Sequence, residues 1–302
     1  MLVNGIVDVV HAFKVFAGEG SKVIGGLEGV SGLLIVPLLF SPSRYIDDSS
    51  VDSIYSVIRG LRPSDGLGVV LLSGGGDVDE AYLLARYLQR IARGRLVVYV
   101  PRYAKSAGTL LALAGDELVM LPVAELGPID PLLYDAKTGR YVPLQSILEM
   151  LDLLSGKTRD LALAVLDRIP VIELGDYKRA VEHNVELCMR VLASRMMKGD
   201  WESSRRVAEK LASYKQHSAA VTIDDLEEIG LNVREARGEE EELLWRLYEL
   251  WVENIVEVEE LTPPKAREPV EFKLGRGVVL TTAPLDLVEK AKSTQSKQEP
   301  PP

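Results

Sequence analysis

The sequence predicts an α/β protein with a parallel βαβ core and helical additions. Short apolar runs of the kind that form buried strands recur along the chain. They alternate with segments whose apolar residues follow helical spacing, and this order is typical of parallel βαβ units. The 302 residues are 47% apolar and 26% charged, so the chain is globular and can bury a core.

The elements follow in order along the chain. The predicted strands are Gly32–Phe40, Gly68–Leu72, Leu96–Val100, Glu117–Met120 and Leu231–Val233, with a strand pair at Val270–Lys273 and Gly277–Leu280. The predicted helices are Met1–Gly18, Asp47–Leu61, a helix after Asp77, a short one after Ser106, Pro143–Leu154, Arg159–Leu166, Asp176–Met197, Trp201–Tyr214 and Glu239–Glu260. Thr222 to Asp225 has the pattern of a capping box, which opens a short helix that ends at Gly230.

These elements suggest one main domain with terminal additions. We expect an amphipathic helix in residues 1–20, the main domain in 21–238, a C-terminal helix in 239–262 and an extension in 263–302. From Ser293 onward the extension is polar and ends in prolines, so we expect its end to be disordered.

Composition excludes several function classes. A net charge of -10 argues against a nucleic-acid partner, because phosphate binding needs a basic face. Cys188 is the one cysteine, so no internal disulfide forms, and we expect a core residue in a reducing, cytoplasmic protein. The three histidines have no metal-ligand spacing, so we expect no metal. Many Arg and Glu residues with few Asn and Gln indicate a heat-adapted source.

The apolar N-terminal part raises the question of a membrane. The run from Val23 to Phe40 is interrupted by Glu28, by glycines and by Pro37, whereas a spanning helix needs roughly 20 clean apolar residues. We therefore expect a buried strand at its end. The helix in residues 1–20 lacks signal-peptide features. It is a candidate for docking on the body, on a partner or peripherally on a membrane.

Ser106 lies where a predicted strand, Leu96–Val100, gives way to a helix. Backbone N–H groups at a helix start have no intrahelical partner, so a nucleophilic hydroxyl or an oxyanion is favoured there. The alternative is that Ser106 only caps the helix, since serine is a preferred cap residue.

A glycine-rich loop, Gly74-Gly75-Gly76, follows the preceding strand. It lacks the Lys-Ser/Thr ending of a phosphate loop and the glycine spacing of a dinucleotide site. Because neighbouring parallel strands end at the same sheet edge, we expect this loop to lie beside Ser106. Its amides could then donate hydrogen bonds to the oxygen of a carbonyl that Ser106 attacks.

Four segments carry a resemblance to a known family: Gly75-Gly76-Asp77, Val100–Thr109, Leu111–Met120 and Leu126–Pro131. They resemble the serine dehydrogenase proteinase family, which belongs with the signal-peptide-peptidase-A and Clp-type serine peptidases. A weaker similarity covers His217–Thr222 and Glu228–Val233. The resemblance spans about residues 20 to 235. It implies a ClpP/crotonase-like fold and a homo-oligomer. Together with the heat-adapted composition, we expect an archaeal, thermophilic source.

The resemblance also implies a function and roles for individual residues. Ser106 becomes the nucleophile of a serine endopeptidase, and Gly75 or Gly76 with Ala107 supplies the oxyanion-hole N–H groups. The expected substrate is a peptide or a protein segment that binds in extended form along the strand edge beside Gly75. This chemistry needs no cofactor. Gly74 stands where relatives commonly have proline.

The general base stays open at this point. Clp-type relatives have a histidine where this chain has Asp130-Pro131. Relatives of the signal-peptide-peptidase type use a later lysine, at a position that Leu144 and Gln145 occupy here. The remaining candidates are Lys137, Lys157, Lys178, His183, Lys215 and His217. His217 is favoured because it precedes the last capped helix, and Lys157 by its distance after the serine. Lys105 is expected to point away from Ser106.

Two alternatives to a peptidase stay open. The missing loop histidine favours an inactive scaffold of the same fold. The fold itself also suits a crotonase-type enzyme that acts on acyl-thioesters. The serine at a strand-to-helix turn argues against the second alternative.

Overall fold

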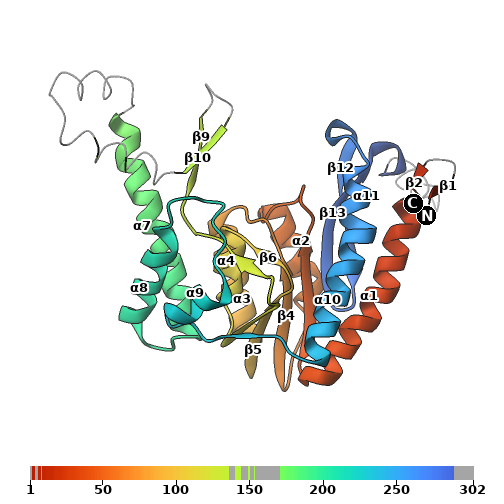
Figure 1. Ribbon diagram of the computed structural model, residues 1–302, viewed down its shortest axis with the longest axis horizontal. Helices are drawn as coiled ribbons and strands as arrows, with labels where there is room; N and C mark the ends of the chain where they lie inside the picture. The colour runs from red at the N-terminus through yellow and green to blue at the C-terminus, as the bar shows by residue number, and fades with distance from the viewer. Residues whose placement is uncertain are drawn as a thin grey trace, which may run out of the picture.

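The computed structural model describes residues 2–3, 6–7, 9–135, 140–143, 149, 153 and 171–288. Its centre is a seven-stranded sheet in the order β11-β7-β5-β4-β3-β13-β12 (Figure 1). In chain order these strands are β3 (Leu34–Phe40), β4 (Gly66–Leu72), β5 (Arg95–Val100), β7 (Glu117–Met120), β11 (Val233–Glu235), β12 (Arg267–Leu274) and β13 (Gly277–Pro284). All neighbours are parallel except β12 and β13, so the predicted α/β fold class is confirmed.

Helices lie around this sheet. They are α1 (Val9–Ser31), α2 (Asp48–Ile58), α3 (Val78–Ile91), α4 (Ala107–Ala112), α7 (Val171–Ser194), α8 (Trp201–Ala212), α9 (Ile223–Glu228), α10 (Glu239–Trp251) and α11 (Glu257–Glu260). A π-helical turn, Val252–Val256, joins α10 to α11, and a 3-10 turn covers Pro264–Ala266. In Figure 1, α1 and α10 run side by side beside β13, and α7, α8 and α9 lie toward the opposite end of the sheet.

Three short strand pairs lie outside the main sheet. β1 (Leu2–Val3) pairs with β2 (Ile6–Val7), and β9 (Leu132–Asp135) with β10 (Arg140–Pro143). β6 (Tyr103–Ala104) pairs with β8 (Glu125–Leu126) just past the end of β5.

The core forms because the central strands are apolar on both faces. Every residue of β4 is buried, as are the residues of β3 from Ile35 onward. Helix α3 buries Ala81, Leu84, Ala85 and Leu88, the positions that helical spacing assigns to one face. Cys188 is fully buried, as expected for a small core residue.

The ends of the chain differ from the sequence-based expectation. The N-terminal helix begins at Val9 rather than Met1, and it continues to Ser31 because Phe16, Ile24 and Leu27 extend the buried stripe. The boundary at residue 20 therefore falls inside α1. The strand expected at Leu231–Val233 is β11, which begins only at Val233.

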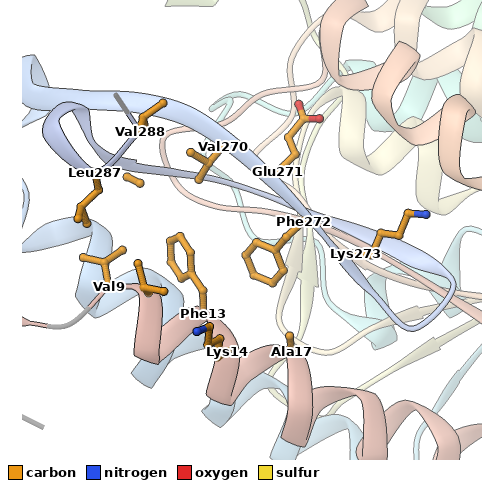
Figure 2. A pocket seen from close by; sticks show the side chains of 12 residues that line it. Val9, Phe13, Lys14, Ala17, Val270, Glu271, Phe272, Lys273, Leu287 and Val288 are labelled. Atoms are coloured by element: carbon orange, nitrogen blue, oxygen red, sulfur yellow. The ribbon is translucent and has the colours of Figure 1, made fainter. Parts of the chain in front are cut away.

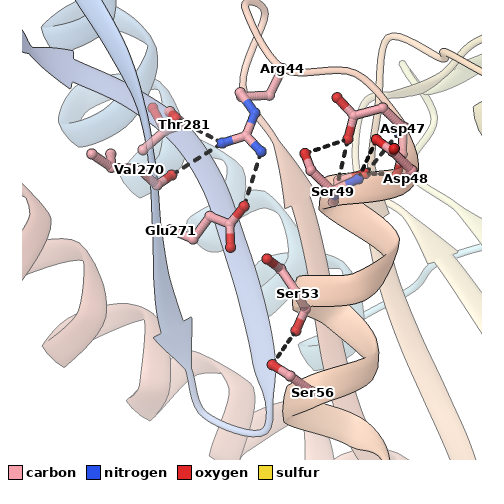
Figure 3. A network of polar contacts seen from close by, with 10 residues as sticks. Arg44, Asp47, Asp48, Ser49, Ser53, Ser56, Val270, Glu271 and Thr281 are labelled. Atoms are coloured by element: carbon pink, nitrogen blue, oxygen red, sulfur yellow. Dashed lines mark hydrogen bonds and ion pairs between the residues drawn. The ribbon is translucent and has the colours of Figure 1, made fainter.

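The C-terminal hairpin of β12 and β13 belongs to the main sheet, since β13 pairs in parallel with β3. Figure 3 shows how the buried Arg44, in the loop after β3, holds this hairpin. Its guanidinium donates to the carbonyl oxygens of Thr281 at 3.3 Å and Val270 at 3.5 Å, and it pairs with Glu271 at 3.0 Å. The same loop leads into Asp47, whose side chain caps α2.

Some expected elements lie outside the described residues. They are the turn around Thr138-Gly139, most of Pro143–Leu154, all of Arg159–Leu166, and the end from Ser293. In the part of the chain that the structure describes, no helix has the length and apolar character required to cross a membrane.

Candidate active site

The glycine-rich loop and Ser106 meet at one edge of the sheet, because β4 and β5 are parallel neighbours. Gly75 has a φ of +106°, in the region that favours glycine. A Cβ atom on Gly75 would lie 2.9 Å from the Ser106 Cβ and 2.8 Å from the Lys105 carbonyl oxygen. The approach of the two loops therefore requires glycine at position 75.

Ser106 has a strained backbone, with φ 53° and ψ -121°, and it is the one non-glycine residue with positive φ in the described ranges. Hydrogen bonds hold the backbone on both sides of Ser106. The Lys105 N–H donates to the Ser73 carbonyl oxygen at 2.9 Å, and the Thr109 N–H donates to the Ser106 carbonyl oxygen at 2.9 Å. The Ser106 side chain makes no capping hydrogen bond, so it does not serve as a simple cap. A strained serine on a strand-to-helix turn is typical of a nucleophile elbow.

Ser106 opens into a cavity of about 560 Å³. Its walls include Gly76, Ala107, Asp130 and His217, so residues from four separate segments share one space with the Ser106 hydroxyl. Of the base candidates from the sequence, His217 is the one that the structure brings to this cavity within the described residues.

His217 is paired with Asp130. The His217 Nδ1 lies 2.9 Å from the Asp130 Oδ1, and the two side chains are 22% and 1% exposed. A hydrogen on Nδ1 that is donated to the carboxylate leaves Nε2 as the proton acceptor of the ring. The Asp130 Oδ2 is buried and has no hydrogen-bond partner in the described part of the chain. The pair therefore supplies an oriented imidazole with a buried carboxyl group behind it.

The sequence did not reveal that Asp130, at the position where the resemblance led us to look for a histidine, contacts His217. His217 lies in a later segment, and Leu126 and Val221 hold the two segments together through reciprocal N–H to carbonyl hydrogen bonds of 2.9 and 3.1 Å. From α7, the Asn184 Nδ2 donates to the Ile129 carbonyl oxygen at 2.7 Å. The chain order serine, aspartate, histidine is that of α/β-hydrolase triads, and this order was the available signal.

The three candidate oxyanion-hole residues differ in what their amides do. The Gly75 N–H donates to the Ser73 Oγ at 3.1 Å. The N–H groups of Gly76 and Ala107 have no acceptor among the described residues, and both residues line the cavity. These two amides are therefore the ones available to a substrate.

The other base candidates lie elsewhere. Lys178 is on α7 with its side chain 75% exposed and pairs with Glu182 at 3.7 Å. The His183 Nε2 is 2.8 Å from the Asp79 Oδ1, outside the cavity, and Lys215 is exposed. Lys137 and Lys157 lie outside the described residues. The described ranges hold no group of three or more side chains suited to bind a metal ion.

A second cavity, of about 420 Å³, lies between α1 and β12 (Figure 2). Its walls are mainly apolar, and the rings of Phe13 and Phe272 stack there with centroids 5.3 Å apart. No serine, cysteine or histidine is among the residues that line it, and its ionisable side chains are those of Lys14, Glu271 and Lys273.

A strained serine that lines a cavity at the sheet edge of an α/β fold is the arrangement that serine hydrolases use. The chain belongs to the family of ClpP-like SDH-type serine proteinases, whose model matches residues 22–271. The ClpP-like fold expected from the sequence motifs is thereby confirmed.

This chain is also similar to two curated relatives and to two solved structures. Uncharacterized protein MJ1495 of Methanocaldococcus jannaschii is 29% identical over 217 residues, which cover 71% of this chain and 67% of that protein. Uncharacterized protein MJ0137 of the same organism is 27% identical over 238 residues, covering 78% and 76%.

Two mutant structures of the 1510-N membrane-bound stomatin-specific protease, one in complex with a substrate peptide, are also similar to this chain. They have TM-scores of 0.44 and 0.43 and identities of 15% and 16%. The matches cover 68% of this chain in both cases, and 79% and 75% of those chains.

Proposed function

We propose that this chain is a serine endopeptidase in which Ser106 is the nucleophile, His217 the general base and Asp130 the residue that orients His217. The observation that carries the proposal is the 2.9 Å contact between His217 and Asp130 in the cavity that Ser106 lines. A base held by a buried carboxylate beside a serine is the arrangement that activates a hydroxyl near neutral pH.

The reaction follows from these positions. The Ser106 Oγ attacks the peptide carbonyl carbon as its proton passes to the His217 Nε2, and the Ala107 and Gly76 N–H groups stabilise the oxyanion. The C–N bond then breaks, and His217 gives its proton to the leaving amine. Water, deprotonated by His217, hydrolyses the acyl-enzyme and releases Ser106. Asp130 stabilises the imidazolium in both steps.

The proposed substrate is an extended peptide. The Ile46 N–H donates to the Gly75 carbonyl oxygen at 2.8 Å, and the Asp77 N–H to the Ile46 carbonyl oxygen at 2.7 Å, so these main-chain groups of the glycine loop are already paired. The main-chain groups of Gly76 have no such partner among the described residues, and Gly76 lines the cavity. This supports pairing with the main chain of an extended peptide there.

Labelling with a fluorophosphonate probe tests the proposal, with Ser106→Ala as the blank. We expect the wild type to label and to hydrolyse casein, His217→Ala to lose both, and His183→Ala to keep both. His183→Ala is a matched control because it disrupts the other histidine–aspartate pair. A folded wild type that does not label overturns the proposal and favours the scaffold alternative.

A further inference from the structure

Lys105, the residue before Ser106, makes contacts that the proposed reaction does not use. Its side chain does not line the cavity, in line with the expectation that it points away from Ser106, and the Nζ lies 2.9 Å from a carboxylate oxygen of Glu125. The Nζ also donates to the carbonyl oxygens of Leu126 at 3.2 Å and Ala219 at 3.3 Å. A lysine ammonium has three N–H donors, and these three acceptors match them.

The three acceptors belong to the segments that carry Asp130 and His217. Glu125 and Leu126 form β8, whose chain continues to Asp130. Ala219 closes a turn that contains His217, because its N–H donates to the Gln216 carbonyl oxygen at 3.0 Å. Lys105, the residue next to the nucleophile, therefore contacts both of the segments that carry the histidine–aspartate pair.

The absence of a side chain at Gly127 leaves room for the side chain of Lys105. A Cβ on Gly127 would lie 2.7 Å from the Lys105 Cδ, so the methylene stem occupies the space that a side chain at position 127 would take. The stem thus packs against Gly127, and the side chain of Lys105 is 21% exposed. The Lys105 side chain therefore has little rotamer freedom. Its ammonium holds the loop of Ser106 at a fixed distance from Glu125, Leu126 and Ala219.

We infer that Lys105 is a positioning residue, whose ammonium sets the placement of His217 relative to Ser106. The inference rests on the proposed function of Ser106 and His217. A displacement of about 1 Å between reacting groups costs up to about 100-fold in rate, so loss of this contact should lower kcat rather than weaken substrate binding.

The test compares Lys105→Met, which keeps the stem and removes the donors, with Lys105→Arg, which keeps the charge but not the three-way geometry. Lys22→Met is the matched control, since Lys22 also pairs with a carboxylate, that of Glu19 at 2.7 Å, but on α1. The readouts are kcat and KM on a fluorogenic peptide, the fluorophosphonate labelling rate across pH, and the ¹⁵N-histidine NMR signals of the ring of His217.

For Lys105→Met we expect kcat and labelling to fall about 10- to 100-fold with KM within about 2-fold, and the His217 Nδ1–H signal to shift. Lys105→Arg should recover part of the rate, and Lys22→Met should match the wild type. Wild-type kcat together with an unchanged His217 signal in Lys105→Met overturns the inference. If Lys105→Met does not fold, Lys105→Arg decides, because wild-type kinetics in that variant also overturn it.

Failure of the proposed function is a separate result. A wild type that does not label contradicts the peptidase proposal, whatever the Lys105 variants do. The His217 ring signal still tests the inference in that case, because it reports the position of the ring without any turnover.

Discussion

The imidazole of His217 lies 2.9 Å from the carboxylate of Asp130, a residue 87 positions earlier in the chain. Ser106 precedes both, so the three residues occur in the order serine, aspartate, histidine. The bridge between Leu126 and Val221 makes this possible, because it places the segment of His217 directly beside the segment that leads to Asp130.

Replacement of Asp130 by Asn should remove most of the activity without unfolding the chain. The amide cannot stabilise the imidazolium, and it can donate to Nδ1 and so select the wrong tautomer. We expect kcat for peptide hydrolysis to fall about a thousand-fold or more, with KM little changed.

Asp79→Asn is the matched control for Asp130→Asn. Asp79 also accepts from a histidine, His183 at 2.8 Å, but on the exposed surface between α3 and α7. The kcat of Asp79→Asn for peptide hydrolysis should stay within about 2-fold of the wild-type value, because an exposed pair contributes little. Equal losses in both variants would contradict the assigned role of Asp130.

Gly75→Ala should destabilise the fold and abolish labelling. The new Cβ would lie 2.9 Å from the Ser106 Cβ, and the φ of +106° is unfavourable for alanine, so we expect a loss of about 2 kcal/mol or more in the free energy of unfolding. Gly74→Ala is the control, because no atom lies within 4 Å of its added Cβ. Urea denaturation measures both, and equal stability of the two variants would contradict the close approach.

Cys188 should be unreactive in the native protein. Burial raises the pKa of its thiol to about 12, so at pH 8 only about one thiol in ten thousand is the reactive thiolate. We expect iodoacetamide to modify the urea-unfolded chain readily and the native chain only as fast as it unfolds. Rapid native modification at pH 8 would show that α7 does not bury this residue as described.

Much of the fold could be predicted from local sequence, because buried parallel strands are short apolar runs and the helices between them have one apolar face. β3, β4, β5 and β7 lie within a few residues of their expected positions. The limits of α1 were harder to predict, since its glycines weaken the helical signal while the buried stripe from Phe16 to Leu27 continues through them.

The candidate site was only half predictable, for a physical reason. Ser106 and the glycine loop follow neighbouring strands, so local order alone brings them together. The pairing of Asp130 with His217 depends on a long-range backbone bridge, and that of Lys105 with Ala219 on side-chain packing. A linear sequence shows neither contact.

The capping box of α9 gives a prediction of pH-dependent stability. The Thr222 backbone N–H and Oγ–H both donate to the Asp225 carboxylate, at 2.8 and 2.7 Å, and these hydrogen bonds hold the pKa of Asp225 below its ordinary value. A carboxyl with a lowered folded-state pKa stabilises the fold above its unfolded-state pKa. That contribution is lost as the pH falls through the folded-state value.

Asp225→Asn should therefore lower the unfolding free energy at pH 7 by roughly 0.5 kcal/mol, since solvent screens this largely exposed carboxylate, and by progressively less as the pH falls below about 4. Urea denaturation at pH 7 and pH 3 measures this difference. Asp224→Asn is the control, because the exposed Asp224 lies on the same turn and accepts no hydrogen bond within the described ranges. Val221 pairs with Leu126 immediately before this cap, so the backbone bridge also holds the start of α9. A loss of unfolding free energy in Asp225→Asn that did not vary with pH would mean that this bridge, rather than the charge of the carboxylate, fixes the start of the helix.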